Sequence, residues 1–139
     1  MNLGTSQIEL ASVEAITSTL ADLQPTIRIG RWLPMANVLR HRHIGQIDDA
    51  CAYPFKALAD APIRQLVAAA GPTHCYDGWA YLARAADCLL TGDARAALHL
   101  AYYAELRAAA SLLACSGVGV FADHHVIVDE NGQDRKSVV

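Results

Sequence analysis

The chain has 139 residues, of which 53% are hydrophobic and only 18% are charged, and its formal net charge is −3. This composition excludes a disordered chain, which would combine low hydrophobicity with high net charge, and it provides no general attraction to nucleic acids or anionic membranes. The length suits one domain with a hydrophobic core, and the low charge suggests that another chain or a further domain covers part of the surface.

The first expected element is an amphipathic helix over residues 6–23. Ser6 and Glu9 have the spacing of a capping box, and apolar residues follow at helical spacing. We expect Pro25 to end this helix. Glycine and proline interrupt residues 26–59, so we expect loops there around one short helix at 35–42.

Three further helices are expected over residues 61–70, 78–91 and 93–115. Asp60 and Pro62 are typical of a helix start, and Gly71-Pro72 is expected to end the helix that they begin. A tight turn at Thr91-Gly92 predicts that the last two helices form an antiparallel αα-hairpin. Large apolar residues are expected on one face of the first of these helices and on the inner face of the second: Trp79, Leu82 and Leu89, then Leu98, Tyr102, Leu106 and Leu113.

Beyond Gly117 the apolar period changes from helical spacing to alternation, which predicts a β-hairpin over residues 118–128. The polar residues 130–139 are expected to form a frayed tail. The predicted fold is therefore mostly α: a single domain with a bundle of four to five helices, an αα-hairpin core and a small C-terminal β-hairpin. The chain is equally compatible with being the opening segment of a longer protein.

No apolar segment reaches the roughly twenty residues that a membrane-spanning helix needs, so no membrane partner is expected. The four cysteines show no CxxC pairing, which favours a reducing cytoplasm over a disulfide framework. Histidine and cysteine spacings fit neither a zinc knuckle nor a helical ligand pair. We therefore expect a cytoplasmic protein with no metal and no other cofactor.

Arg95 and His99 are the candidate catalytic residues, because a spacing of four places them on the same side of the last helix. A guanidinium beside an imidazole can bind a phosphate and move a proton, as RNA cleavage requires. The alternative is an ordinary solvated helix face. A basic cluster in the first third is the candidate RNA contact, with a solvated loop as its alternative: Arg28, Arg31, Arg40, His41, Arg42 and His43, of which Arg40, Arg42 and His43 are the expected binding residues.

Several segments between residues 79 and 128 carry a family resemblance: WAYLARA at 79–85, Gly92-Asp93, HLAYYAELRA at 99–108, SLLA at 111–114 and GVGVF at 117–121. They resemble the helical core of YaaC-like proteins, which are bacterial and broadly similar to the HEPN superfamily. The resemblance implies a helical, often dimeric domain; many HEPN-like domains are RNases of toxin–antitoxin or phage-defence systems, and others only bind. The active form usually carries Arg and His separated by four to six residues, whereas three residues separate Arg95 from His99.

The sequence and the resemblance together predict a non-catalytic helical module for interaction or dimerisation, in a bacterial cytoplasmic system linked to defence or to toxin–antitoxin pairs. Its expected partner is a second copy or another protein domain. The alternative is a HEPN-type, metal-independent RNase that acts on RNA through Arg95 and His99.

Overall fold

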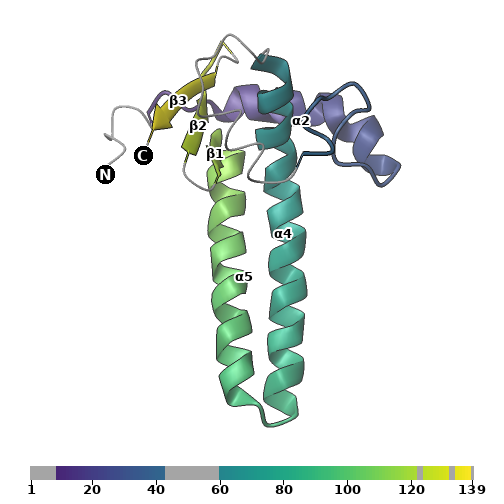
Figure 1. Cartoon of the computed structure of the whole chain (residues 1–139), viewed down its shortest axis with the longest axis vertical. Helices are drawn as coiled ribbons and strands as arrows, with labels where there is room; N and C mark the ends of the chain where they lie inside the picture. Colours follow the sequence, from purple (N-terminus) through teal and green to yellow (C-terminus); the bar gives the residue numbers. More distant parts are fainter. Residues whose placement is uncertain (1–8, 43–59, 122–123, 132–133, 139) are drawn as a thin grey trace.

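The computed structural model describes residues 9–42, 60–121, 124–131 and 134–138. Their helices and strands follow in the order α2 (Val13–Arg28), α4 (Asp60–Leu90), α5 (Ala94–Cys115), β1 (Val118–Val120), β2 (His124–Val128) and β3 (Asp134–Val138). Figure 1 shows a head, where α2 crosses the start of α4 beside the sheet, and a shaft of two long antiparallel helices. "Head" below denotes α2, residues 29–42, residues 60–71 and the sheet; "shaft" denotes the rest of α4 together with α5.

The mostly α fold, with its αα-hairpin and C-terminal β-hairpin, is confirmed, but the described residues contain three helices rather than four or five. The expected single-domain organisation stays a prediction.

Helix α2 begins later and ends later than expected. The Ser12 side chain caps it by accepting a hydrogen bond from the Ala15 backbone N–H at 3.1 Å. The expected cap, Ser6, lies outside the described residues. Pro25 lies inside the helix instead of ending it. A proline so close to the C-terminus removes a single helical hydrogen bond, and Ile27 in the last turn packs against the core.

The helix expected at 35–42 is wrong: these residues form turns. Asn37 explains the difference, because its buried side chain competes with helical hydrogen bonding. Its Oδ1 accepts from the Leu39 backbone N–H at 2.8 Å, and its Nδ2 donates to the Pro62 carbonyl and to Gln65 on α4. The side chain thus ties this loop to the start of α4.

The helices expected at 61–70 and 78–91 are one continuous helix, α4, of 31 residues. Gly71-Pro72 does not break it. On either side of the proline, the Thr73 hydroxyl donates to the Ala69 carbonyl and the Ser111 hydroxyl of α5 donates to the Gly71 carbonyl, each at 2.7 Å. Gly71 is also at a close approach, since a Cβ there would lie 2.8 Å from the Cys115 Sγ. Packing against α5 therefore overrides the local signal for a break.

The final helix and the turn before it match the prediction. Asp93 caps α5 by accepting from the Ala96 N–H at 3.0 Å, and Gly92 takes a φ of 85° in the turn between α4 and α5. The helix ends at Cys115 before Gly117, whose φ is 92°. Local signals thus determine both ends of α5 and the turn that joins it to α4.

The sheet has the order β1-β2-β3, and both pairings are antiparallel. The pairing of Val118 with Ile127 confirms the expected β-hairpin. Residues 134–138, expected within a frayed tail, instead form β3 along the other edge of β2. The edge of a two-stranded ribbon offers unpaired backbone groups, and the turn at Asp129, where the side chain accepts from the Asn131 N–H, directs the chain back towards it.

The core lies almost wholly in the head. Ile63 and Val67 of α4 are completely buried, and they pack with residues of α2, the 31–39 loop and β2: Ile16, Leu23, Leu33, Leu39, Val126 and Val128. In the shaft, the buried residues are small, such as Ala85 and Ala97. The head therefore supplies most of the burial that stabilises the fold.

Candidate functional site

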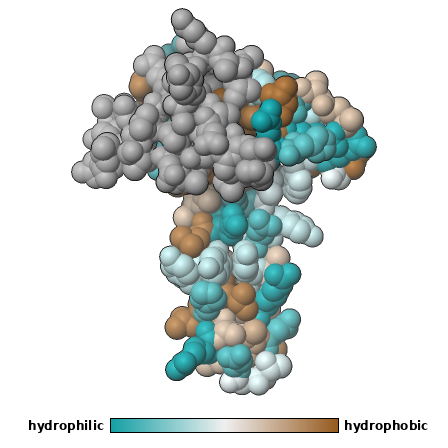
Figure 2. All heavy atoms as spheres, in the orientation of Figure 1, coloured by the Kyte–Doolittle hydropathy of each residue, from teal (hydrophilic) through white to brown (hydrophobic). Residues whose placement is uncertain are grey.

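The shaft exposes large apolar side chains, including Leu98, Leu106 and Leu113 of α5, which the sequence predicted to point inward. Trp79 is 68% exposed and Leu98 is 75% exposed, and Leu82, Leu89, Leu106 and Leu113 are exposed too. A space-filling view shows hydrophobic residues reaching the shaft surface beside hydrophilic ones (Figure 2). The prediction that Leu98, Leu106 and Leu113 are core residues is therefore wrong among the residues that the structure describes.

The physical reason is the seam between α4 and α5, which is built from small residues. Gly71, Gly78 and Ala85 recur every seven residues along α4. A Cβ on Gly78 would lie 3.5 Å from the Ala104 carbonyl oxygen and 3.4 Å from the Arg107 Cβ, so the two backbones approach closely. Helices that touch through such small residues leave no room between them for leucine or tryptophan, which therefore lie outside the seam.

Two shallow hollows run along one side of the shaft and share Leu82 and Ala101. Trp79 and Leu112 line the hollow nearer the head, and Leu89 and Leu98 line the one nearer the tip. We call the five large exposed apolar residues that line these two hollows the apolar face: Trp79, Leu82, Leu89, Leu98 and Leu112. A continuous exposed apolar surface of this kind marks a protein-binding site more often than a plain solvated surface.

One line of residues on α5 adjoins this face and carries both charge signs. Arg95, Leu98, Tyr102 and Glu105 are spaced by three, four and three residues, so they lie along one side of the helix. All four are exposed and line a common hollow. We call them the α5 stripe; it has a cation at one end, an anion at the other and apolar groups between.

The structure places the predicted catalytic pair near the free end of the shaft. Arg95 and His99 are both exposed and line the hollow of the α5 stripe. The His99 ring meets Tyr103 edge-on, with ring centroids 4.9 Å apart, and Tyr103 stacks on Tyr81 of α4. The expected proximity of Arg95 and His99 is thus present, in a setting open to solvent.

Arg40 and Arg42 of the predicted RNA-binding cluster lie in the head, whereas Arg95 lies in the first turn of α5, which begins at the far end of the shaft (Figure 1). Arg42 is exposed in the turns after α2, while Arg40 is partly buried and its guanidinium contacts the Met35 sulfur. His43 lies outside the described residues. The structure therefore does not bring the two predicted functional clusters together.

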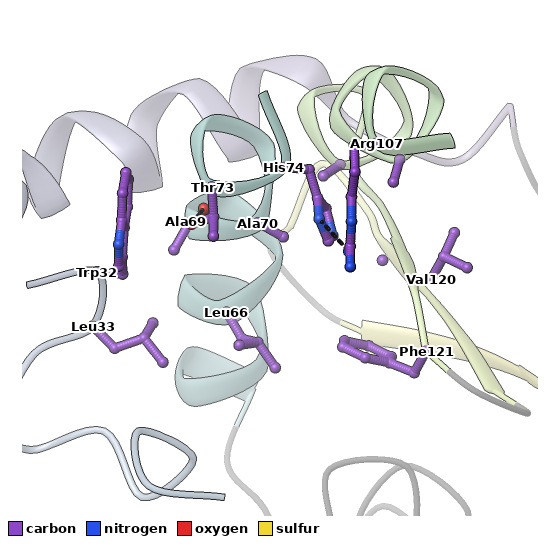
Figure 3. A pocket seen from close by; sticks show the side chains of 13 residues that line it. Trp32, Leu33, Leu66, Ala69, Ala70, Thr73, His74, Arg107, Val120 and Phe121 are labelled. Atoms are coloured by element: carbon purple, nitrogen blue, oxygen red, sulfur yellow. Dashed lines mark hydrogen bonds between the residues drawn. The ribbon is translucent and has the colours of Figure 1, made fainter. Parts of the chain in front are cut away.

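Sequence reasoning missed a further site where the head meets the shaft. A cavity of about 410 Å³ lies between the 32–33 segment, α4, α5 and β1, with mainly apolar walls. In it, Arg107 of α5 donates a hydrogen bond of 3.1 Å to Nδ1 of His74 on α4 (Figure 3). The two residues are 33 positions apart, and no spacing pattern links them.

The imidazole in this pair is held in its neutral form. Burial, and after it the positive charge of Arg107, lower the pKa of His74, while Asp77 acts in the opposite direction. A guanidinium can only donate, so Nδ1 must accept and the proton lies on Nε2. The site therefore presents one positive charge, on Arg107.

Other kinds of site are not indicated by the part of the chain that the structure describes. None of its helices is long and apolar enough to cross a membrane. No three metal-ligating side chains gather among these residues.

No protein-family model matches this sequence, and neither the curated proteins nor the solved structures yield a match.

Proposed function

We propose that this protein is a non-catalytic helical interaction module, and that two copies associate through the apolar faces of their shafts. The observation that carries the proposal is the exposed apolar face, with Trp79 and Leu98 each more than two-thirds exposed. Each such leucine or tryptophan gains about 1.5–3 kcal/mol when it is fully buried. A second shaft offers a matching apolar face, and together the two would form a four-helix bundle.

The charges on the α5 stripe favour an antiparallel arrangement of the two shafts. Arg95 and Glu105 are separated by ten residues, or about 15 Å of helix. A twofold axis passing near Leu100 would place each Arg95 beside Glu105 of the other copy, with each Leu98 beside Tyr102. Parallel shafts in register would instead oppose Arg95 to Arg95 and Glu105 to Glu105. Like charges in an interface are repulsive, so the stripe is complementary to itself in one orientation.

A charge-swap series tests both the association and its geometry. Light scattering and sedimentation should show the wild type to be dimeric at micromolar concentration. Arg95→Glu and Glu105→Arg should each weaken the dimer about tenfold, and the double variant should restore it. Arg84→Glu is the control, because Arg84 is an exposed shaft arginine outside the stripe.

A wild type that stays monomeric at these concentrations would contradict the proposal. A dimer that neither single swap weakens would retain the association but contradict the antiparallel register. The resemblance of residues 79–128 to YaaC-like and HEPN-like proteins supports the further proposal that the module works in a bacterial cytoplasmic defence system.

A HEPN-type RNase is the second candidate function, and one observation favours it. Arg95 and His99 line the same hollow as Tyr102 and Glu105, so a phosphate and a proton-transfer group could meet there. Purified protein should then degrade RNA in the presence of a chelator, and His99→Ala should abolish the degradation while His41→Ala does not. RNA left intact by the wild type would exclude this activity.

A further inference from the structure

The cavity between head and shaft combines one partly buried cation with apolar walls. Arg107 and His74 form its polar end, and Trp32 and Leu33 lie across it from them (Figure 3). Leu66 lies between the two groups, and Phe121 lines the cavity on the side of Arg107 (Figure 3). Its volume of about 410 Å³ falls within the roughly 300–1,000 Å³ typical of small-molecule sites.

The charge of Arg107 is incompletely matched. Its guanidinium is half-buried and donates to the neutral His74, and no carboxylate pairs with it among the residues that the structure describes. Because burial removes water from a charged group, an unpaired guanidinium in an apolar cavity is costly, and a bound anion offsets that cost.

His74 determines how the guanidinium is presented. By accepting one N–H of Arg107, its Nδ1 holds the planar group at one edge and leaves the other donors for a ligand. A carboxylate fits such a group best, since its two oxygens can accept two parallel hydrogen bonds. A nucleotide or another multiply charged anion is a poor match, because the cavity provides a single positive charge.

We infer that this cavity binds a small organic monocarboxylate, with the carboxylate on Arg107 and an aromatic or branched apolar body against Trp32, Leu33, Leu66 and Phe121. This site is independent of the proposed self-association. Arg107 lies on the opposite side of α5 from the α5 stripe, as its position two residues beyond Glu105 requires.

Calorimetric titration at pH 7.5 with a matched pair of probes tests the inference. The acid is 3-phenylpropanoate and the neutral analogue is 3-phenylpropanamide, which has nearly the same shape. The acid should bind at least about tenfold more tightly than the amide, because only the acid carries the charge that Arg107 matches. Arg107→Gln should remove this preference while retaining weak binding of the amide. Arg84→Gln, which removes an exposed arginine elsewhere on the shaft, should leave the preference unchanged.

A second variant guards against a folding defect in Arg107→Gln. Ala110 lines the cavity beside Arg107 and is half-buried, so Ala110→Leu narrows the cavity while every charge remains. It should weaken both probes, and circular dichroism should show that the helical content is unchanged. The inference is overturned if neither probe binds to the wild type, if the acid and the amide bind equally well, or if Arg107→Gln keeps the preference for the acid.

Discussion

The head and the shaft contain similar apolar residues but bury them to very different extents. In the head, Ile63 and Val67 are fully enclosed because three kinds of element converge on them: α2, the 31–39 loop and the sheet. In the shaft, α4 and α5 pack on each other among the described residues, and their small-residue seam leaves Trp79 and Leu98 outside. The comparison teaches that two helices alone cannot enclose large side chains. The described part of the head thus encloses its large apolar residues, whereas large apolar residues of the shaft remain available to a partner.

The largest expected effect tests the burial of the head. Ile63→Ala should lower the free energy of unfolding by about 3 kcal/mol, because it removes a completely buried side chain and leaves a cavity. Leu90→Ala is the control at the tip of the shaft, where the leucine is exposed, and should cost less than about 0.5 kcal/mol. Urea unfolding of the two variants measures both values, and equal losses would contradict the contrast between head and shaft.

The second effect concerns the point where the shaft meets the head. Gly117 has a φ of 92°, and a Cβ there would lie 3.1 Å from the Ser12 backbone nitrogen and 3.2 Å from the Val128 carbonyl oxygen. Gly117→Ala should therefore cost about 2 kcal/mol, combining backbone strain with a clash against atoms that cannot rotate away. Gly92→Ala at the tip shares the positive φ but meets open space, so it should cost about 1 kcal/mol. Urea unfolding distinguishes the two; a larger loss for Gly92→Ala would refute this account of Gly117.

The third prediction sharpens the proposed geometry of the shaft dimer. Leu98 and Leu112 are exposed to similar extents, 75% and 71%. An antiparallel overlap centred near Leu100 would cover the part of the apolar face that contains Leu98 and would leave Leu112, at the head end of that face, outside it. Leu98→Ala should raise the dissociation constant at least about tenfold, since each dimer loses two buried leucines. Leu112→Ala should change it little. Sedimentation equilibrium measures both, and a larger effect of Leu112→Ala would require another register.

The smallest expected effect is the pH dependence that arises at the junction of head and shaft. Because the pKa of His74 is lowered in the folded protein, the unfolded chain binds a proton more readily as the pH falls below the ordinary value of 6.5. The contribution of His74 to stability is therefore fully present above pH 6.5 and is lost below it. The charged groups that act on this ring are Arg107 and Asp77.

His74→Gln removes this titration and can keep an acceptor for Arg107. The decrease in unfolding free energy between pH 7.5 and pH 5.5 should be smaller in this variant than in the wild type. Urea unfolding at both pH values measures this decrease. An equal decrease in the variant and the wild type would show that His74 contributes nothing to the acid sensitivity.

Much of the shaft and part of the candidate site were predictable from local patterns. Asp93 and Gly117 mark the two ends of α5, and the turn at Gly92 predicts the αα-hairpin, because caps and positive-φ glycines act through neighbouring residues. The proximity of Arg95 and His99 follows from their spacing of four on one helix. The pairing of His74 with Arg107 could not be predicted from the sequence. The two residues are 33 positions apart, and their contact depends on how α4 packs against α5.

The sequence by itself determined where α5 and the first two strands form, since the signals for their ends lie within a few residues of each end. The tertiary structure decided where α4 ends and which apolar residues of the two long helices are exposed. Because α4 packs against α5, it continues without a break past Gly71-Pro72, where the local sequence predicts the end of a helix. The close contact of the two helices at Gly71 and Gly78 turned the large apolar residues outward. Helical periodicity shows which residues share a face, but only the neighbours of that face determine whether it is buried.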